Sequence, residues 1–184
     1  MLNYGEGPGK LAGQLGVSVD EAKALIRKYF TPYPDVERFI NSVHNFILDH
    51  AKVGTILGRV RRFPELPAIG EMLEKMNFWS LPGTARKNLA QANRQSVNSV
   101  IQGSAADVAR MAMILCERDE RLRDLGVMML LQIHDELIFE VPEENVELAK
   151  PIIRELMEHP LGFELLVPLA IDMGVGYTWA TAKA

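Results

Sequence analysis

The chain has 184 residues, 48% of them hydrophobic, and a formal net charge of −4. This length is enough for one good-sized hydrophobic core with a smaller lobe attached. No apolar run approaches the roughly 18 residues that span a bilayer, and no basic segment followed by an apolar one marks a signal peptide, so we expect no membrane partner. The single cysteine, Cys116, excludes an internal disulfide framework and indicates a reducing compartment.

The negative net charge by itself argues against a nucleic-acid-binding protein, but the charges are unevenly distributed. Residues 52–94 hold eight basic and three acidic residues, whereas acidic residues dominate residues 117–158. Such a distribution presents one basic face to a polyanion while the whole chain stays acidic. Ordinary solvated helix faces would give the same pattern, so the charges leave both interpretations open.

The first third of the chain predicts three helices. Ser18, followed three residues later by Glu21, is a capping box that opens the second of them. A Thr-Pro-Tyr-Pro segment separates the second helix from the third, and Gly54 is expected to stop the third. The three helices are predicted over residues 10–15, 18–30 and 34–53.

Residues 55–64 predict a strand or hairpin that is dense in arginine. Guanidinium groups match the geometry of phosphate oxygens, so an arginine-rich strand with interleaved apolar residues is a good phosphate-binding surface. Residues 64–82 are expected to be irregular, apart from a short helix near residues 71–76.

A long helical pattern runs from Gly83 to about Leu122, with a break predicted at Gln102-Gly103. The part after the break, residues 105–115, is almost wholly apolar, which predicts a buried helix. In the part before it, Arg94, Asn98 and Gln102 recur every fourth residue and therefore line one face. Their donors could reach base edges, although a solvated polar stripe has the same spacing.

Residues 127–133 and 137–141 predict two strands joined by a tight turn at His134, Asp135 and Glu136. Adjacent carboxylates between apolar strands repel each other unless water or a cation meets them. Mg²⁺ takes oxygen ligands and often only one or two protein carboxylates, so it is a natural partner. A solvated acidic turn is the alternative. A helix over residues 142–158 and a strand over residues 165–171 follow.

Several of these segments together resemble the family A DNA polymerases. Residues 132–137, Gln-Ile-His-Asp-Glu-Leu, resemble motif C of that family, and residues 94–107 are similar to the segment just upstream of it. Residues 58–64 resemble the Gly-Arg-Arg segment before the long palm helix, and Tyr4-Gly5 resembles the end of the fingers helix that carries motif B. The Gly-Tyr-Thr-Trp sequence near the end is similar to the family terminus. The resemblance covers nearly the whole chain in the family's order.

The resemblance implies an α+β fold, a partial polymerase palm with an antiparallel motif C hairpin packed on long helices. It implies a finger-side helical segment at residues 1–53 and a palm segment at residues 54–184. By resemblance, Asp135 is a ligand of a two-metal Mg²⁺ site, Glu136 is an auxiliary carboxylate and His134 positions the primer end. The residues expected to contact primer–template DNA are Arg94, Asn98, Gln102, Arg59, Arg61, Arg62 and Tyr4.

The sequence departs from the family in lacking motif A and the body of the motif B helix, which hold a second metal-binding aspartate and grip the deoxynucleoside triphosphate. We therefore expect the C-terminal catalytic portion of a DNA polymerase, inactive alone and completed by an N-terminal chain or segment. Residues 6–10 are closer to phage-type relatives, which suggests the cytoplasm of a bacterium or of a phage-infected cell. A non-catalytic nucleic-acid-binding or scaffold protein that retains the fold is the alternative.

Overall fold

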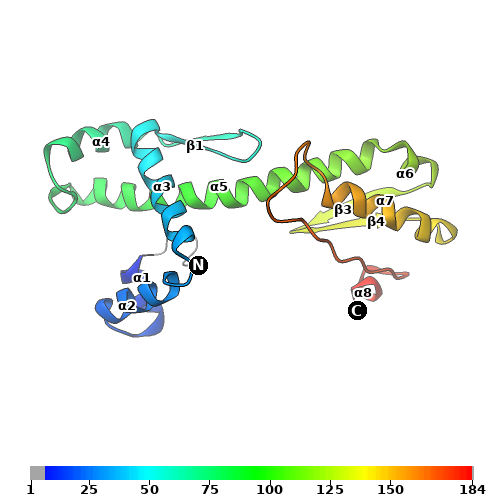
Figure 1. Cartoon of the computed structure of the whole chain (residues 1–184), viewed down its shortest axis with the longest axis horizontal. Coiled ribbons are helices and arrows are strands. Elements are labelled where there is room, and N and C mark those ends of the chain that lie inside the picture. The colour runs from blue at the N-terminus through cyan, green and yellow to red at the C-terminus, as the bar shows by residue number, and fades with distance from the viewer. Residues whose placement is uncertain (1–6, 184) are drawn as a thin grey trace. The chain divides into compact units, whose positions relative to one another are not determined.

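Helices make up most of the computed structural model, which describes residues 7–183 and contains two small antiparallel sheets. The contacts divide the chain into one unit that ends at Ser104 and a second that begins at Ala105. This mixed, helix-rich architecture agrees with the predicted α+β class (Figure 1). Among the residues that the structure describes, no helix is both long and apolar enough to cross a membrane.

The first unit begins with three helices, α1 (Pro8–Leu15), α2 (Val19–Phe30) and α3 (Pro34–His50). The predicted capping box is confirmed, because the Glu21 backbone N–H donates to the Ser18 hydroxyl at 3.2 Å and the Ser18 N–H donates to the Glu21 carboxylate at 2.9 Å. The prediction that Gly54 stops α3 was wrong. The helix ends at Ala51, which adopts a left-handed φ of 50°, and Gly54 belongs to the next strand.

The core of the first unit lies between α3 and the N-terminal part of α5 (Gly83–Arg118). A hairpin of β1 (Lys52–Gly54) and β2 (Val60–Arg62), the helix α4 (Leu66–Lys75) and the short helix η2 (Phe78–Ser80) connect them. Ile47, Phe63 and Leu66 are its most deeply buried large side chains. The predicted arginine-dense hairpin is therefore present, although it begins at Lys52 rather than at Thr55, and its base is held by this core.

The predicted break in the long helix was wrong, because α5 continues through Gln102-Gly103 without interruption. Ser104 was expected to cap a new helix. Instead its hydroxyl donates to the carbonyl of Val100, four residues back, at 2.5 Å, and accepts a hydrogen bond from the Ile56 N–H at 2.9 Å. A serine that bonds back to the preceding turn is compatible with a continuous helix.

The second unit packs the end of α5 and α6 (Glu120–Asp124) with α7 (Val146–Glu158) against a two-stranded sheet. That sheet consists of β3 (Met128–Ile133) and β4 (Glu136–Glu140), followed by η3 (Glu143–Asn145) and the short C-terminal helix α8 (Trp179–Ala182). Cys116 lies in this core, where burial, with a smaller contribution from Asp119, raises the pKa of its thiol to about 11.

Two predictions for the second unit were wrong. Residues 105–115 are mostly half-buried, and Ile114 is 41% exposed, because few described elements cover this apolar part of α5. Residues 165–171 form no strand. Pro168 lacks an N–H donor, the segment pairs with neither described sheet, and Leu166 lies fully exposed.

Candidate active site and nucleic-acid interface

The acidic turn of the second unit is a two-residue connection between paired strands. Ile133 pairs with Glu136, which leaves His134 and Asp135 as the turn. His134 has a φ of +54°, in the left-handed region that two-residue hairpin turns require at their first position. Few residues other than glycine adopt this conformation, although histidine is enriched among them. The Gln132 side-chain amide donates to the His134 carbonyl at 2.9 Å, which supports the turn.

The turn exposes one carboxylate to solvent and leaves a second half-buried. His134 and Asp135 are exposed, whereas Glu136 at the start of β4 is half-buried. The Glu136 carboxylate accepts a hydrogen bond from the ammonium of Lys183 at 2.5 Å. The oxygens of Asp135 therefore project beside a carboxylate that already has a cationic neighbour.

A β-bulge lies three residues before the turn. Met129 pairs with Phe139 and Leu131 with Ile138, so Leu130 has no partner in β4. An extra residue in one strand bends it and increases its twist, and bulges are common beside active sites. Leu130 and Leu131 are both about half exposed, so one surface of this hairpin remains uncovered by the described residues.

The donor set at the turn fits a hard divalent cation that is completed from outside this chain. Asp135 and Glu136 supply oxygen atoms only, and the described residues contain no group of three or more His, Cys, Asp or Glu side chains that could hold a metal. Mg²⁺ is commonly bound through one or two carboxylates together with water and substrate phosphates. The turn can therefore contribute part of a magnesium site, but not all of it.

Three of the predicted DNA-contacting residues share a face of α5 within the first unit. Arg94, Asn98 and Gln102 are all exposed and follow one another at intervals of about one helical turn. Between them the helix presents guanidinium and amide donors to solvent. Tyr4, also predicted to contact DNA, lies outside the described residues.

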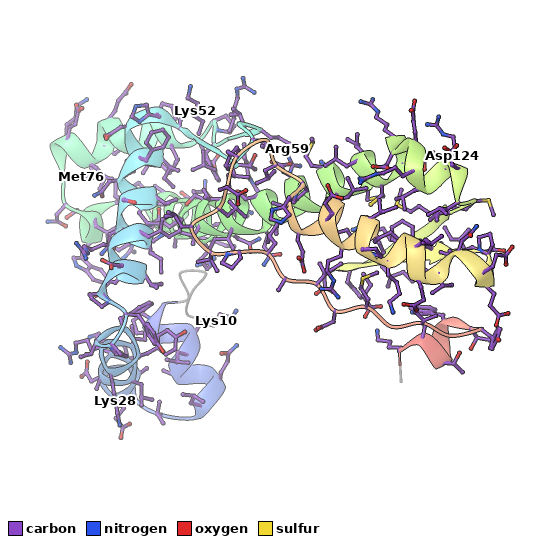
Figure 2. All side chains as sticks on the ribbon, turned by 45° about the vertical axis from the view of Figure 1, so that its right-hand side comes forward. Lys10, Lys28, Lys52, Arg59, Met76 and Asp124 are labelled. Carbon is purple, nitrogen blue, oxygen red and sulfur yellow. The ribbon has the colours of Figure 1, made fainter. Side chains whose placement is uncertain are left out.

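Two of the three predicted phosphate-binding arginines contact α5 directly. Arg59, labelled in Figure 2 on the β1–β2 hairpin, donates to the Gly103 carbonyl at 2.9 Å. Arg61 donates to the Ser99 hydroxyl at 3.0 Å and to the Gln95 side-chain oxygen at 2.8 Å. Its guanidinium also lies 5.5 Å from the centre of the Phe63 ring. Arg62 is exposed, and its guanidinium makes no comparable hydrogen bond to the described residues.

The hairpin also approaches the backbone of α5 closely. A Cβ atom added at Gly103 would lie 2.7 Å from Cγ2 of Thr55, closer than nonbonded carbon atoms come. The Thr55 rotamer is held in turn, because its hydroxyl accepts the Arg59 N–H at 3.1 Å. Glycine at position 103 therefore allows the hairpin to lie against the helix.

Sequence reasoning missed Gln95, Ser99 and Lys183 as neighbours of the candidate site residues. Gln95 and Ser99 follow Arg94 and Asn98, respectively, by one residue. They form a second polar row with the same four-residue spacing, and this pattern could have identified them. For Lys183 no signal existed, because 47 positions separate it from Glu136.

The family model described as DNA polymerase family A matches residues 1–181 of this chain. A thermostable DNA polymerase I from Thermus filiformis is 35% identical over 180 residues, which cover 98% of this chain and 19% of that protein. DNA polymerase I from Chloroflexus aurantiacus is 37% identical over 176 residues, which cover 96% of this chain and 17% of that protein. The chain thus spans less than a fifth of the length of these relatives.

A solved structure shows the same likeness. The POL domain of Pol1 from M. smegmatis, in complex with DNA primer-template and dNTP, matches this chain with a TM-score of 0.81 and 34% sequence identity. The match covers 100% of this chain and 29% of that one. It confirms the predicted fold class.

Proposed function

Because this chain belongs to DNA polymerase family A, we propose that it is the C-terminal catalytic portion of a template-directed DNA polymerase. It adds deoxynucleotides to a primer 3′ end jointly with a segment that carries motif A and the body of the motif B helix. Residues 1–53 are the finger-side part and residues 54–184 the palm part. The cell is bacterial or phage-infected, and the site of action is its cytoplasm.

The observation that carries the proposal is the two-residue turn that presents Asp135 next to Glu136 between paired strands. Asp135 holds magnesium through its exposed carboxylate, and Glu136 is the auxiliary carboxylate beside it. His134, held in the left-handed conformation, positions the primer terminus. When bound, a pair of Mg²⁺ ions activates the primer hydroxyl and stabilises the leaving pyrophosphate.

The exposed face of α5 is the proposed contact with the primer–template duplex. Arg94, Asn98 and Gln102 donate to minor-groove acceptors, which A·T and G·C pairs present at equivalent positions. Such contacts test the shape of a base pair without reading its identity. Tyr4, in the segment whose sequence resembles the end of motif B, contributes a further contact with the DNA.

The arginines of the hairpin divide two tasks between them. Arg59 donates a hydrogen bond to Gly103, and Arg61 donates to Ser99 and Gln95. These bonds hold the hairpin against α5. Arg62 is exposed and binds a backbone phosphate through its guanidinium fork. The hairpin thereby adds a cation to the proposed duplex contact.

The experiment is a primer-extension assay of this chain alone, of a chain that supplies motifs A and B, and of the two mixed, with size-exclusion chromatography alongside. We expect synthesis and a stable complex only in the mixture, because one carboxylate pair cannot hold two Mg²⁺ ions in a fixed geometry. Synthesis by this chain alone at enzyme-like rates would overturn the two-part proposal.

The alternative, a non-catalytic nucleic-acid-binding or scaffold protein, gives a different result in the same assay. In that case the mixture binds primer–template DNA but extends no primer with any deoxynucleotide mixture. A preparation of a full-length family member serves as the positive control for the DNA and the buffer.

A further inference from the structure

We propose that Lys183 is an intrinsic counter-ion of the acidic turn, which a divalent cation bound at Asp135 and Glu136 displaces. The inference rests on the proposed function, because it requires a metal at that turn. It adds a positioning residue to the site and links metal binding to the position of the C-terminal helix.

The contact itself is direct. The Lys183 ammonium lies 2.5 Å from one carboxylate oxygen of Glu136, the residue next to Asp135. Two neighbouring carboxylates are stabilised by a nearby positive charge. In the described structure this charge comes from Lys183, so the ammonium lies where a metal cation would meet the same oxygen.

Local interactions determine where Lys183 lies. Thr178 and Thr181 form a reciprocal capping box that begins α8. The Tyr177 hydroxyl donates to the Glu143 carboxylate at 2.8 Å, which ties the residue before this cap to η3.

Two glycines allow the segment before α8 to fold closely onto it. A Cβ atom at Gly174 would collide with the carbonyl of Ala182, and one at Gly176 would lie 2.5 Å from the Ala182 nitrogen. Side chains at these two positions would therefore push α8, and Lys183 just after it, away from its present place.

The pair is suited to exchange with a metal ion. The Lys183 side chain is 62% exposed and that of Glu136 is 40% exposed. Exposed ion pairs are individually weak and are screened by salt. A dication that gains both carboxylates interacts more strongly with them than a single ammonium, and it also repels that ammonium.

The same segment contains a tryptophan whose fluorescence can report on Lys183. The Lys183 ammonium lies 6.0 Å from the centre of the Trp179 ring. The second tryptophan of the chain, Trp79, belongs to the other unit. In a Trp79→Phe background, the indole emission therefore follows the surroundings of Trp179 alone.

The test uses the full chain in this background at low salt. Mn²⁺ affinity is measured by electron paramagnetic resonance, and Trp179 emission is recorded during a Mg²⁺ titration. The variants are Lys183→Ala, Lys183→Arg and Asp135→Asn, and the charge-matched control is Lys150→Ala, which removes an ammonium that pairs with Glu147 on α7.

We expect Mg²⁺ to change the Trp179 emission of the parent chain, and Lys183→Ala to show the changed emission before any metal is added. Lys183→Ala should bind Mn²⁺ roughly two- to fivefold more tightly, the scale of one exposed ion pair. Lys183→Arg should behave like the parent because it keeps the charge, and Lys150→Ala should leave both measurements unchanged.

Two further outcomes separate this inference from the function on which it rests. If Mn²⁺ binding depends on Asp135 but is equal in the parent and Lys183→Ala, the counter-ion role is wrong and the metal site stands. If Asp135→Asn leaves Mn²⁺ binding unchanged, the metal site itself is wrong, and so is the proposed role of Lys183.

Discussion

The guanidinium of Arg61 on β2 donates a hydrogen bond of 2.8 Å to the side-chain oxygen of Gln95 on α5. The same guanidinium donates a second hydrogen bond to Ser99, one helical turn further along α5. A guanidinium used in this way fixes the distance between hairpin and helix. Among the arginines expected to bind phosphate, Arg61 therefore holds the hairpin on α5, and Arg62 is the one that we propose binds DNA.

This division of tasks predicts opposite effects of two single substitutions. Arg62→Ala should weaken duplex binding about equally for all sequences and reduce the slope of log affinity against log salt by about 1. Arg61→Ala should instead lower the free energy of unfolding by about 1 kcal/mol, the scale of its lost hydrogen bonds. Salt-dependent binding assays and denaturant unfolding measure the two. A full salt slope in Arg62→Ala would contradict the assignment.

Gly103→Ala should destabilise the first unit by about 1–3 kcal/mol, because the added methyl group meets Thr55 and forces the hairpin off the helix. Chemical denaturation measures the effect. Gly9→Ala on α1, where the added methyl group would meet nothing within 4 Å, is the matched control. A double variant that also carries Thr55→Ser removes the obstructing Cγ2 and should recover much of the loss. No recovery would argue against the close approach as the cause.

Asp135→Asn in the complete polymerase should slow the chemical step by at least ~10³-fold, the scale of losing a main electrostatic stabiliser of the transition state. DNA affinity should change little, because the substitution is isosteric and leaves every arginine proposed to contact DNA in place. Single-turnover kinetics measure the step. Glu140→Gln, which neutralises an exposed carboxylate at the end of β4, is the control. Near-normal rates in Asp135→Asn would remove it from the catalytic site.

Gln102→Ala should weaken extension of matched primers by roughly 1–3 kcal/mol, about equally for all four template bases. The reason is that minor-groove acceptors occupy equivalent positions in every Watson–Crick pair. Steady-state extension on four templates that differ only at the primer terminus measures this. Gln14→Ala on α1 controls for loss of an exposed amide. A strong dependence on the terminal base pair would show that the contact reads sequence instead.

The chain should lose stability as the pH falls below about 6.5, because of His44. Burial lowers the pKa of this imidazole, although a hydrogen bond with the Asn93 backbone partly opposes the shift. Its Nε2 atom has no hydrogen-bond partner among the described residues. The unfolded chain therefore takes up a proton at a higher pH than the folded chain does. The stabilising contribution is complete above the ordinary pKa of 6.5 and declines as the pH falls toward the lower folded value.

Unfolding free energies measured at several pH values between 7 and 5 test this effect of His44. His44→Gln should flatten the pH dependence, whereas His159→Gln, which changes an exposed imidazole of the other unit, should not. Carboxylates with lowered pKa, such as Glu21, contribute to the pH dependence mainly near and below their ordinary pKa of 4.5. Equal slopes in the parent and His44→Gln would contradict the assignment.

The sequence by itself determined the features that depend on near neighbours. The capping box at Ser18 and Glu21, the turn at His134 and Asp135, and the row of Arg94, Asn98 and Gln102 all follow from residues at most eight positions apart. Hydrogen bonds across one helical turn and the two-residue periodicity of strands act within such distances, so local patterns predict them well.

Only the tertiary structure decided features that depend on distant partners. Gly103 looked like a helix break, yet it lies inside α5. The reason for a glycine there is Thr55, nearly fifty positions earlier, which packs where a side chain would be. Residues 165–171 have the pattern of a strand but pair with no strand of the described residues. The contact of Lys183 with Glu136 also joins residues that no local pattern relates, because folding alone brings their charges together.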